Sequence, residues 1–106
     1  RETPQKAAKQ LDLQQVIEQA ADYHQLSMDD LVSKRRTKDV VLARQVAMYL
    51  AREETEASLP QIGAALGGRN HSTVLHGCQK IAEELADNAD LQRTVSDIRR
   101  NLYVPN

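Results

Sequence analysis

Short hydrogen-bonding side chains are concentrated in residues 67–76, which read GGRNHSTVLH. The two glycines indicate a tight turn, and the small polar residues from Asn70 to Thr73 then begin a helix. A helix that enters a DNA groove needs such groups at the end that faces the bases and phosphates. The segment is therefore typical of the start of a recognition helix, whereas an ordinary core helix does not need it.

The residues before this segment predict a second helix that leads into the turn. Residues 58–61, SLPQ, form a capping box with proline in the first turn, so a short helix is expected from Ser58 to the glycines. A helix, a tight turn and another helix have the proportions of a helix-turn-helix. A plain helical hairpin has the same pattern, so the pattern alone leaves both interpretations open.

A basic cluster in residues 34–38, KRRTK, is the second candidate for chemistry. In a predicted loop, four basic side chains among five residues suit contact with phosphates or with an adjacent minor groove. A solvated turn or a localisation-like patch would also explain the cluster. Arg44, Gln45 and Arg52 follow on the expected polar side of the next helix, which favours the DNA interpretation.

The charge of the chain varies strongly along its length, although its formal net charge at pH 7 is only -1. Residues 10–33 contain five acidic residues and no Lys or Arg, which gives a local net charge of -5. Residues 34–80 contain eight Lys and Arg against four Asp and Glu, which gives +4. Both candidate clusters thus lie in a basic middle segment that suits a polyanionic partner.

Apolar residues at helical spacing predict the elements that must position these clusters. The chain has 106 residues, 41% of them hydrophobic and only 3% aromatic, which favours one all-α domain, a compact bundle of about six helices. In the recognition helix the expected core stripe is Val74, Cys78, Ile81 and Leu85. The helices are expected over about residues 12–24, 27–32, 39–53, 58–66, 70–85 and 91–104, with Asp12 and Asp39 as two of the caps and Pro105 as the final stop.

Metal binding and catalysis find little support in the residue types present. His71 and His76 are five positions apart and point about 140° away from each other on a helix, and Cys78 belongs to the core stripe. Residues 63–70 resemble a phosphate-binding P-loop, but Arg and Asn stand where that loop needs Lys and then Ser or Thr. We therefore expect a binding module without metal or cofactor, not an enzyme.

The single cysteine and the lack of long apolar runs bear on location. One cysteine cannot form an internal disulfide, and no apolar run reaches the length of a signal peptide or a membrane-spanning helix. A cytoplasmic location is expected. Residues 1–10 are polar and have no stable apolar stripe, so they are expected to be a linker or the tail of a preceding domain.

A longer similarity decides between the open interpretations. Residues 62–63 and 67–81 closely resemble the signature of the bacterial replication initiator family DnaA. Residues 31–36 and 43–51 also resemble the C-terminal domain of that family, and the similarity runs from about residue 11 to residue 103 without a gap. A match of this length is far more specific than a general helix-turn-helix pattern.

The resemblance implies a Trp-repressor-like helix-turn-helix fold with a basic loop. It also implies that residues 11–106 bind double-stranded DNA at the DnaA box, an asymmetric, partly AT-rich element of the bacterial replication origin. An ATPase domain, which would hold ATP and Mg²⁺, would precede residue 1. The expected partners then include that domain, other initiator protomers and acidic phospholipids, which the basic helix over residues 39–52 could contact.

Roles for individual residues follow from the same resemblance. Base-reading residues are expected in the major groove, with one arginine in the minor groove, while phosphate contacts fix the register without reading sequence. The expected base contacts are Arg36 in the minor groove and Pro60, Asn70, His71, Ser72 and Leu75 in the major groove. The expected phosphate contacts are Lys34, Arg44, Gln45, Arg52, Thr73 and Lys80.

Two positions depart from the usual residues of the family. Asn70 stands where Asp is usual; a carboxylate suits the amino group of cytosine, whereas Asn offers one acceptor and adds a donor. The base preference at that position is therefore open. Ser72 stands where Thr is commoner, which removes a methyl group but keeps the hydroxyl, and we expect this change to be mild.

Two other functional classes remain as alternatives. An interaction-only helical domain would use the acidic residues 10–33 as its contact surface, although that surface could instead face an ATPase domain. Another helix-turn-helix regulator of transcription would share the fold. Equal binding to a DnaA-box duplex and to a scrambled duplex would favour an interaction module or non-specific binding.

Overall fold

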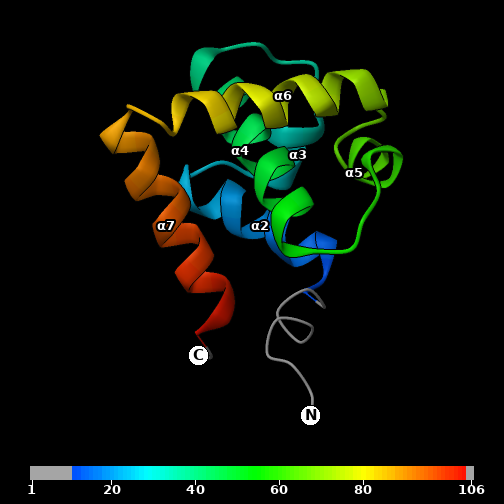
Figure 1. The fold of residues 1–106 in the computed structure, drawn as a ribbon. Coiled ribbons are helices and arrows are strands. Elements are labelled where there is room, and N and C mark those ends of the chain that lie inside the picture. Colours follow the sequence, from blue (N-terminus) through cyan, green and yellow to red (C-terminus); the bar gives the residue numbers. More distant parts are fainter. Residues whose placement is uncertain (1–10, 105–106) are drawn as a thin grey trace.

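The computed structural model describes residues 11–104, which form six helices and no strand (Figure 1). The all-α fold predicted from the sequence is confirmed, and the predicted helix bounds differ from the observed ones by about one or two residues. The linker prediction for residues 1–10 and the stop at Pro105 fall outside the described residues. The helices are α2 (Leu13–Tyr23), α3 (Met28–Val32), α4 (Lys38–Glu54), α5 (Leu59–Ala65), α6 (His71–Glu84) and α7 (Ala89–Tyr103).

Side-chain caps fix the beginning of four of these helices. Ser27 and Ser58 form complete capping boxes at α3 and α5, in which the serine hydroxyl accepts a backbone N–H and the side chain three residues later accepts the serine N–H. Asn70 and Asn88 cap α6 and α7 with their side-chain oxygens. Each cap satisfies one of the N–H groups that a helix start leaves without an intrahelical partner.

Two caps predicted from the sequence are wrong in detail. Asp12 occupies the N-cap position of α2, but its side chain makes no capping hydrogen bond. The N-cap of α4 is Thr37, so Asp39 lies inside the first turn of the helix. An acidic residue is favourable there as well, because the positive end of the helix dipole stabilises its charge. The sequence pattern therefore located the helix but misplaced its start.

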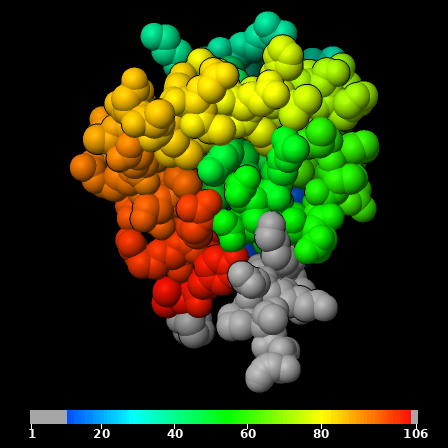
Figure 2. Space-filling view, in the orientation of Figure 1, coloured from blue at the N-terminus to red at the C-terminus, as the bar shows by residue number. Residues whose placement is uncertain are grey.

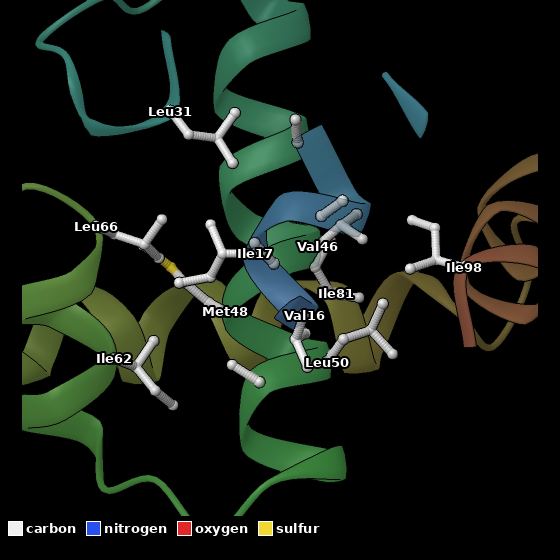
Figure 3. Close-up of a cluster of buried hydrophobic side chains, with 14 of the residues drawn as sticks. Val16, Ile17, Leu31, Val46, Met48, Leu50, Ile62, Leu66, Ile81 and Ile98 are labelled. Atoms are coloured by element: carbon white, nitrogen blue, oxygen red, sulfur yellow. The ribbon is translucent and has the colours of Figure 1, made fainter. Parts of the chain in front are cut away.

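The core is built around α4, against which α2 and α6 pack most extensively. Ala43, Ala47 and Ala51 recur every fourth residue along α4 and are fully buried, so the neighbouring helices can approach closely. Figure 3 shows the apolar side chains that converge on this helix from the others. The fully buried side chains from the surrounding helices include Val16, Ile17, Leu31, Ile62, Val74, Ile81 and Ile98.

Gly77 sets the distance between α6 and α4. A Cβ atom at this position would lie 2.5 Å from Sδ of Met48 and 3.5 Å from Cγ of Gln45. The next residue, Cys78, is buried, and its thiol donates to the Met48 carbonyl at 3.4 Å. Burial raises the pKa of this thiol, as expected of a structural cysteine. The close contact holds the inner face of α6 on the core and leaves its polar face outside.

Candidate nucleic-acid interface

The turn between α5 and α6 needs glycine for two separate reasons. Gly67 and Gly68 have φ angles of 86° and 84°, in the left-handed region that side chains with a Cβ rarely adopt. A Cβ on Gly67 would also lie 2.3 Å from the Val32 carbonyl oxygen, whereas a Cβ on Gly68 would meet open space. Hydrogen bonds of 3.0 and 2.9 Å from the N–H groups of Gly68 and Arg69 to the Gly63 carbonyl close the turn. The tight turn predicted from the two glycines is confirmed.

The first turn of α6 presents polar side chains to the outside, as the helical spacing predicts. His71, Ser72 and Thr73 are exposed, and Leu75 is half-buried beside them. Asn70 is exposed as well, but its Oδ1 accepts the Thr73 N–H at 2.9 Å and so caps the helix. An open hollow of about 340 Å³ is lined here by Asn70, Ser72, Thr73 and His76. The inner stripe of Val74, Cys78 and Ile81 is buried.

The basic loop, residues 33–37, lies beside α6 at one end of the molecule (Figure 1). Its side chains from Lys34 to Thr37 are all exposed. Arg36 and Lys38 share a hollow of about 310 Å³ with Gln45 of α4 and Lys80 of α6. Residues that are more than 40 positions apart in the sequence therefore form one continuous surface, which the space-filling view shows along its upper edge (Figure 2).

Arg44 does not lie on the polar side of α4, where the sequence analysis placed it. The residue is only 6% exposed. Its Nε donates to the Leu31 carbonyl at 2.8 Å, Nη1 to the Arg35 carbonyl at 3.2 Å and Nη2 to the Ser33 carbonyl at 3.2 Å. The end of α3 and the loop after it leave carbonyls without helical partners, and the buried Arg44 side chain donates hydrogen bonds to them from α4. Its predicted direct contact with phosphate stays a prediction.

Arg69 is a residue of this surface that sequence reasoning missed. Its Nη2 donates to the Ser33 carbonyl at 2.7 Å, and its Nη1 donates to the Leu66 carbonyl. The side chain therefore ties the turn of the helix-turn-helix to the basic loop. Its position directly after two glycines was the only sequence feature that pointed to this role. The acceptors are backbone carbonyls, which every residue has, so they leave no residue-specific pattern in the sequence.

Arg36, Arg44 and Arg69 concentrate positive charge at the seam between the loop, α4 and α6. Together with Gln45 and Thr73 they line a hollow of about 490 Å³, and none of its lining residues is acidic. Burial lowers the pKa of Arg44, and the charges of the other two arginines lower it further. Burial and the charge of Arg36 lower the pKa of Arg69 in the same way. Arginine remains charged at neutral pH despite such shifts, so the hollow attracts anions.

Comparison with known proteins decides the family. A family model described as the bacterial dnaA protein helix-turn-helix matches residues 13–81, well over half of the chain. The chain belongs to the DnaA family. The matched residues include α2 to α5 and most of α6, and therefore both helices and the turn described above. The family predicted from the sequence is confirmed.

Similar DnaA proteins and one solved structure agree with this result. The chromosomal replication initiator protein DnaA of Lactobacillus delbrueckii subsp. bulgaricus is 45% identical over 92 residues, which are 87% of this chain and 20% of that protein. DnaA of Limosilactobacillus reuteri is 40% identical over 96 residues, 91% of this chain and 22% of that protein. The chain thus spans about a fifth of the length of these relatives.

The solved structure extends the agreement to the fold. It is the crystal structure of a DNA replication initiation factor, 31% identical, and it superposes with a TM-score of 0.75 over 86% of this chain and 28% of the other. The helix-turn-helix predicted from residues 58–85 is therefore present, and the plain hairpin is not needed to explain the pattern.

α7 lies beyond the residues that the DnaA family model matches, and polar contacts attach it to the rest of the domain. Nε of Arg99 lies 2.7 Å from a carboxylate oxygen of Glu54, at the end of α4. The Tyr103 hydroxyl donates to the other oxygen of the same carboxylate. Burial and the charge of Glu54 raise the pKa of Tyr103 to about 12. The contacts anchor α7 on α4, at a distance from the glycine turn.

The remaining predicted site residues of the DnaA domain lie on three different helices. Pro60 is exposed in the first turn of α5, and Arg52 is exposed in the last turn of α4. Gln45 is half-buried and lines two of the hollows described above. Lys80 forms a 2.9 Å ion pair with Glu84, whose hydrogen bond and charge raise the pKa of Lys80. Lys80 is therefore positioned beside the basic loop by a neighbour on its own helix.

Residues 11–104 contain neither a candidate metal site nor a candidate membrane span. No group of three or more His, Cys, Asp or Glu side chains in this part of the chain is placed to hold a metal ion. No helix within it combines the length and the apolar character needed to cross a membrane.

Proposed function

We propose that this chain is an origin-binding domain that recognises the DnaA box in double-stranded DNA. One observation carries the proposal: the exposed polar start of α6 and the exposed basic loop lie side by side (Figure 2), and the 2.7 Å hydrogen bond from Arg69 to Ser33 ties the turn before α6 to that loop. A protruding helix start suits the major groove, and a neighbouring basic loop suits the adjacent minor groove.

In the proposed complex, the residues at the start of α6 read base edges. Asn70, His71 and Ser72 supply short polar groups, and Leu75 supplies an apolar contact for a thymine methyl. Pro60, exposed on the preceding helix, contacts a second methyl group. Arg36 enters the minor groove from the loop. The exposure of these side chains, or half-exposure for Leu75, supports the assignment.

Other residues of the same surface hold the DNA backbone. The seam lined by Arg36, Arg44 and Arg69 attracts phosphate because three guanidinium groups meet there without a lining carboxylate. The Thr73 side chain lies in this seam, in the first turn of α6. The proposed phosphate contacts are Lys34, Gln45, Arg52, Thr73 and Lys80, with Arg44 acting mainly through the loop that it holds.

The proposal includes a place for the domain in a larger protein. Since the chain spans about a fifth of its relatives, we assign it as the non-enzymatic DNA-binding module of a cytoplasmic initiator whose ATPase domain lies elsewhere. Acidic phospholipids are a secondary proposed partner. The apolar residues of α4 are mostly buried, with Leu42 38% exposed, so such contact would be electrostatic and would use the basic loop.

Fluorescence anisotropy with a DnaA-box duplex and a scrambled duplex at physiological salt tests the proposal. We expect the box to bind at least about a hundredfold more tightly, since specific sites usually exceed non-specific DNA by more than that. Arg36→Ala should remove much of this preference. Arg93→Ala, which removes an exposed arginine side chain from α7, is the matched control and should retain the preference for the box. Equal affinity of the unaltered chain for both duplexes would favour an interaction module or non-specific binding.

A further inference from the structure

Asn70 has one side-chain amide, and the helix that it caps fixes the orientation of that amide. Oδ1 accepts the Thr73 N–H at 2.9 Å. A rotation that exchanged oxygen and nitrogen would place the amide NH₂ against this N–H, donor against donor, and would remove the cap. The oxygen must therefore point toward the helix, and the NH₂ group is the part left for an external partner.

The position of the amide makes it available to a base edge. Asn70 is exposed and lines the same hollow as Ser72, Thr73 and His76 at the start of α6. In the major groove, guanine offers two acceptors, O6 and N7, while thymine offers O4 and adenine offers N7. Cytosine offers only an amino donor there. An NH₂ group that points outward therefore pairs with guanine and opposes cytosine.

We infer that Asn70 sets the base preference of this domain at one position of its site, for guanine and against cytosine; the inference rests on the proposed function. Adenine is less suitable, because the usual Asn–adenine pair presents both the oxygen and the NH₂ group to the base, and here the oxygen is directed toward the Thr73 N–H. An Asp in the same place would cap with one oxygen and present a second acceptor. Asn70→Asp should therefore reverse the preference.

The chain provides a matched control for this substitution. Asn88 caps α7 in the same way, with Oδ1 accepting the Leu91 N–H at 3.0 Å. Asn88→Asp makes the same chemical change and adds the same charge, but on another helix. Asp is as good an N-cap as Asn, so both variants should fold, and their melting curves verify this.

The experiment measures the affinity of all three proteins for duplexes in which each position of the site is changed to all four bases. At one position we expect the unaltered chain to bind guanine about fivefold more tightly than cytosine, as one hydrogen bond implies. Asn70→Asp should favour cytosine at that same position by a similar factor. Asn88→Asp should keep the ranking of the unaltered chain.

Each possible result has a distinct meaning. Reversal in Asn70→Asp alone supports the inference. Identical rankings for Asn70→Asp and the unaltered chain at every position overturn it, although sequence-specific binding would still support the proposed function. A reversal that also occurs in Asn88→Asp overturns it, because charge alone would then be the cause. No base preference at any position for the unaltered chain overturns both the inference and the proposed function.

Discussion

The Arg69 guanidinium donates to the Ser33 carbonyl at 2.7 Å, and so connects the glycine turn with a loop 36 residues earlier in the sequence. Arg44 donates to the same oxygen from α4 at 3.2 Å. One backbone carbonyl thus receives hydrogen bonds from two arginines on different elements. The basic loop and the helix-turn-helix are positioned as one unit because of this shared acceptor.

Removing Arg69 should detach the loop from the turn without deleting any predicted base contact. We expect Arg69→Ala to raise amide hydrogen exchange in residues 33–37 and to weaken binding of the DnaA box more than binding of scrambled DNA. Arg35→Ala is the control, because Arg35 is an exposed arginine of the same loop and forms its ion pair with Asp30. Unchanged exchange in Arg69→Ala would contradict the positioning role.

Removing His71 tests base reading on α6. His71→Ala should lower the affinity for the specific site by about 1–3 kcal/mol and change affinity for random duplex little, because phosphate contacts remain. Anisotropy titrations on both duplexes measure the difference. His24→Ala, at the end of α2, serves as the control histidine, since its Nδ1 contacts only the Ala20 carbonyl at 2.8 Å among the hydrogen bonds described. Equal losses on both duplexes would show that His71 does not read bases.

Replacing Arg44 should destabilise the folded domain, whereas replacing Lys34 should not. Arg44→Ala removes the donor to the Leu31 carbonyl at the buried end of α3, so we expect a loss of about 2–3 kcal/mol in the free energy of unfolding. Lys34 is exposed, and Lys34→Ala should leave stability nearly unchanged. Urea denaturation measures both effects.

Salt dependence of DNA binding separates the same two residues. Lys34→Ala should reduce the slope of log affinity against log salt by about one unit, as loss of one phosphate contact requires. Arg44→Ala should change the slope less than Lys34→Ala, provided that titrations are made where the variant is folded. A full unit of slope lost in Arg44→Ala would show that its guanidinium also contacts phosphate directly.

The two glycines of the turn should tolerate alanine unequally. Both substitutions impose the cost of a positive φ angle, about 1 kcal/mol, but Gly67→Ala also forces a Cβ to within 2.3 Å of the Val32 carbonyl oxygen. Gly67→Ala should therefore lower the thermal midpoint considerably more than Gly68→Ala does. Equal midpoints would mean that α3 moves away freely from the turn.

Features of the chain with a local cause were predictable from the sequence. Glycines at 67 and 68 indicate the turn, and the small polar residues that begin at Asn70 and the apolar spacing of Val74, Cys78 and Ile81 indicate α6. These signals lie within a few residues of the structure that they cause. The same local reasoning located the capping box at Ser58.

Features that depend on distant backbone atoms were not predictable. Burial of Arg44 follows from carbonyls at the end of α3, and the role of Arg69 follows from the carbonyl of Ser33. A carbonyl is present at every residue, so no residue type marks the acceptor. Helical spacing places a charged residue on the polar face by default, and here the need to satisfy buried carbonyls was stronger.

A free loop of five residues would lose conformational entropy on binding, at a cost of about 1–2 kcal/mol per residue for its backbone. In this domain Arg44 and Arg69 already restrain the backbone at Ser33 and Arg35. Much of the ordering cost is therefore met during folding, and less remains to oppose association with DNA. In the proposed complex, Arg44 and Arg69 thus increase affinity by pre-organising a loop whose exposed arginines are the proposed contacts.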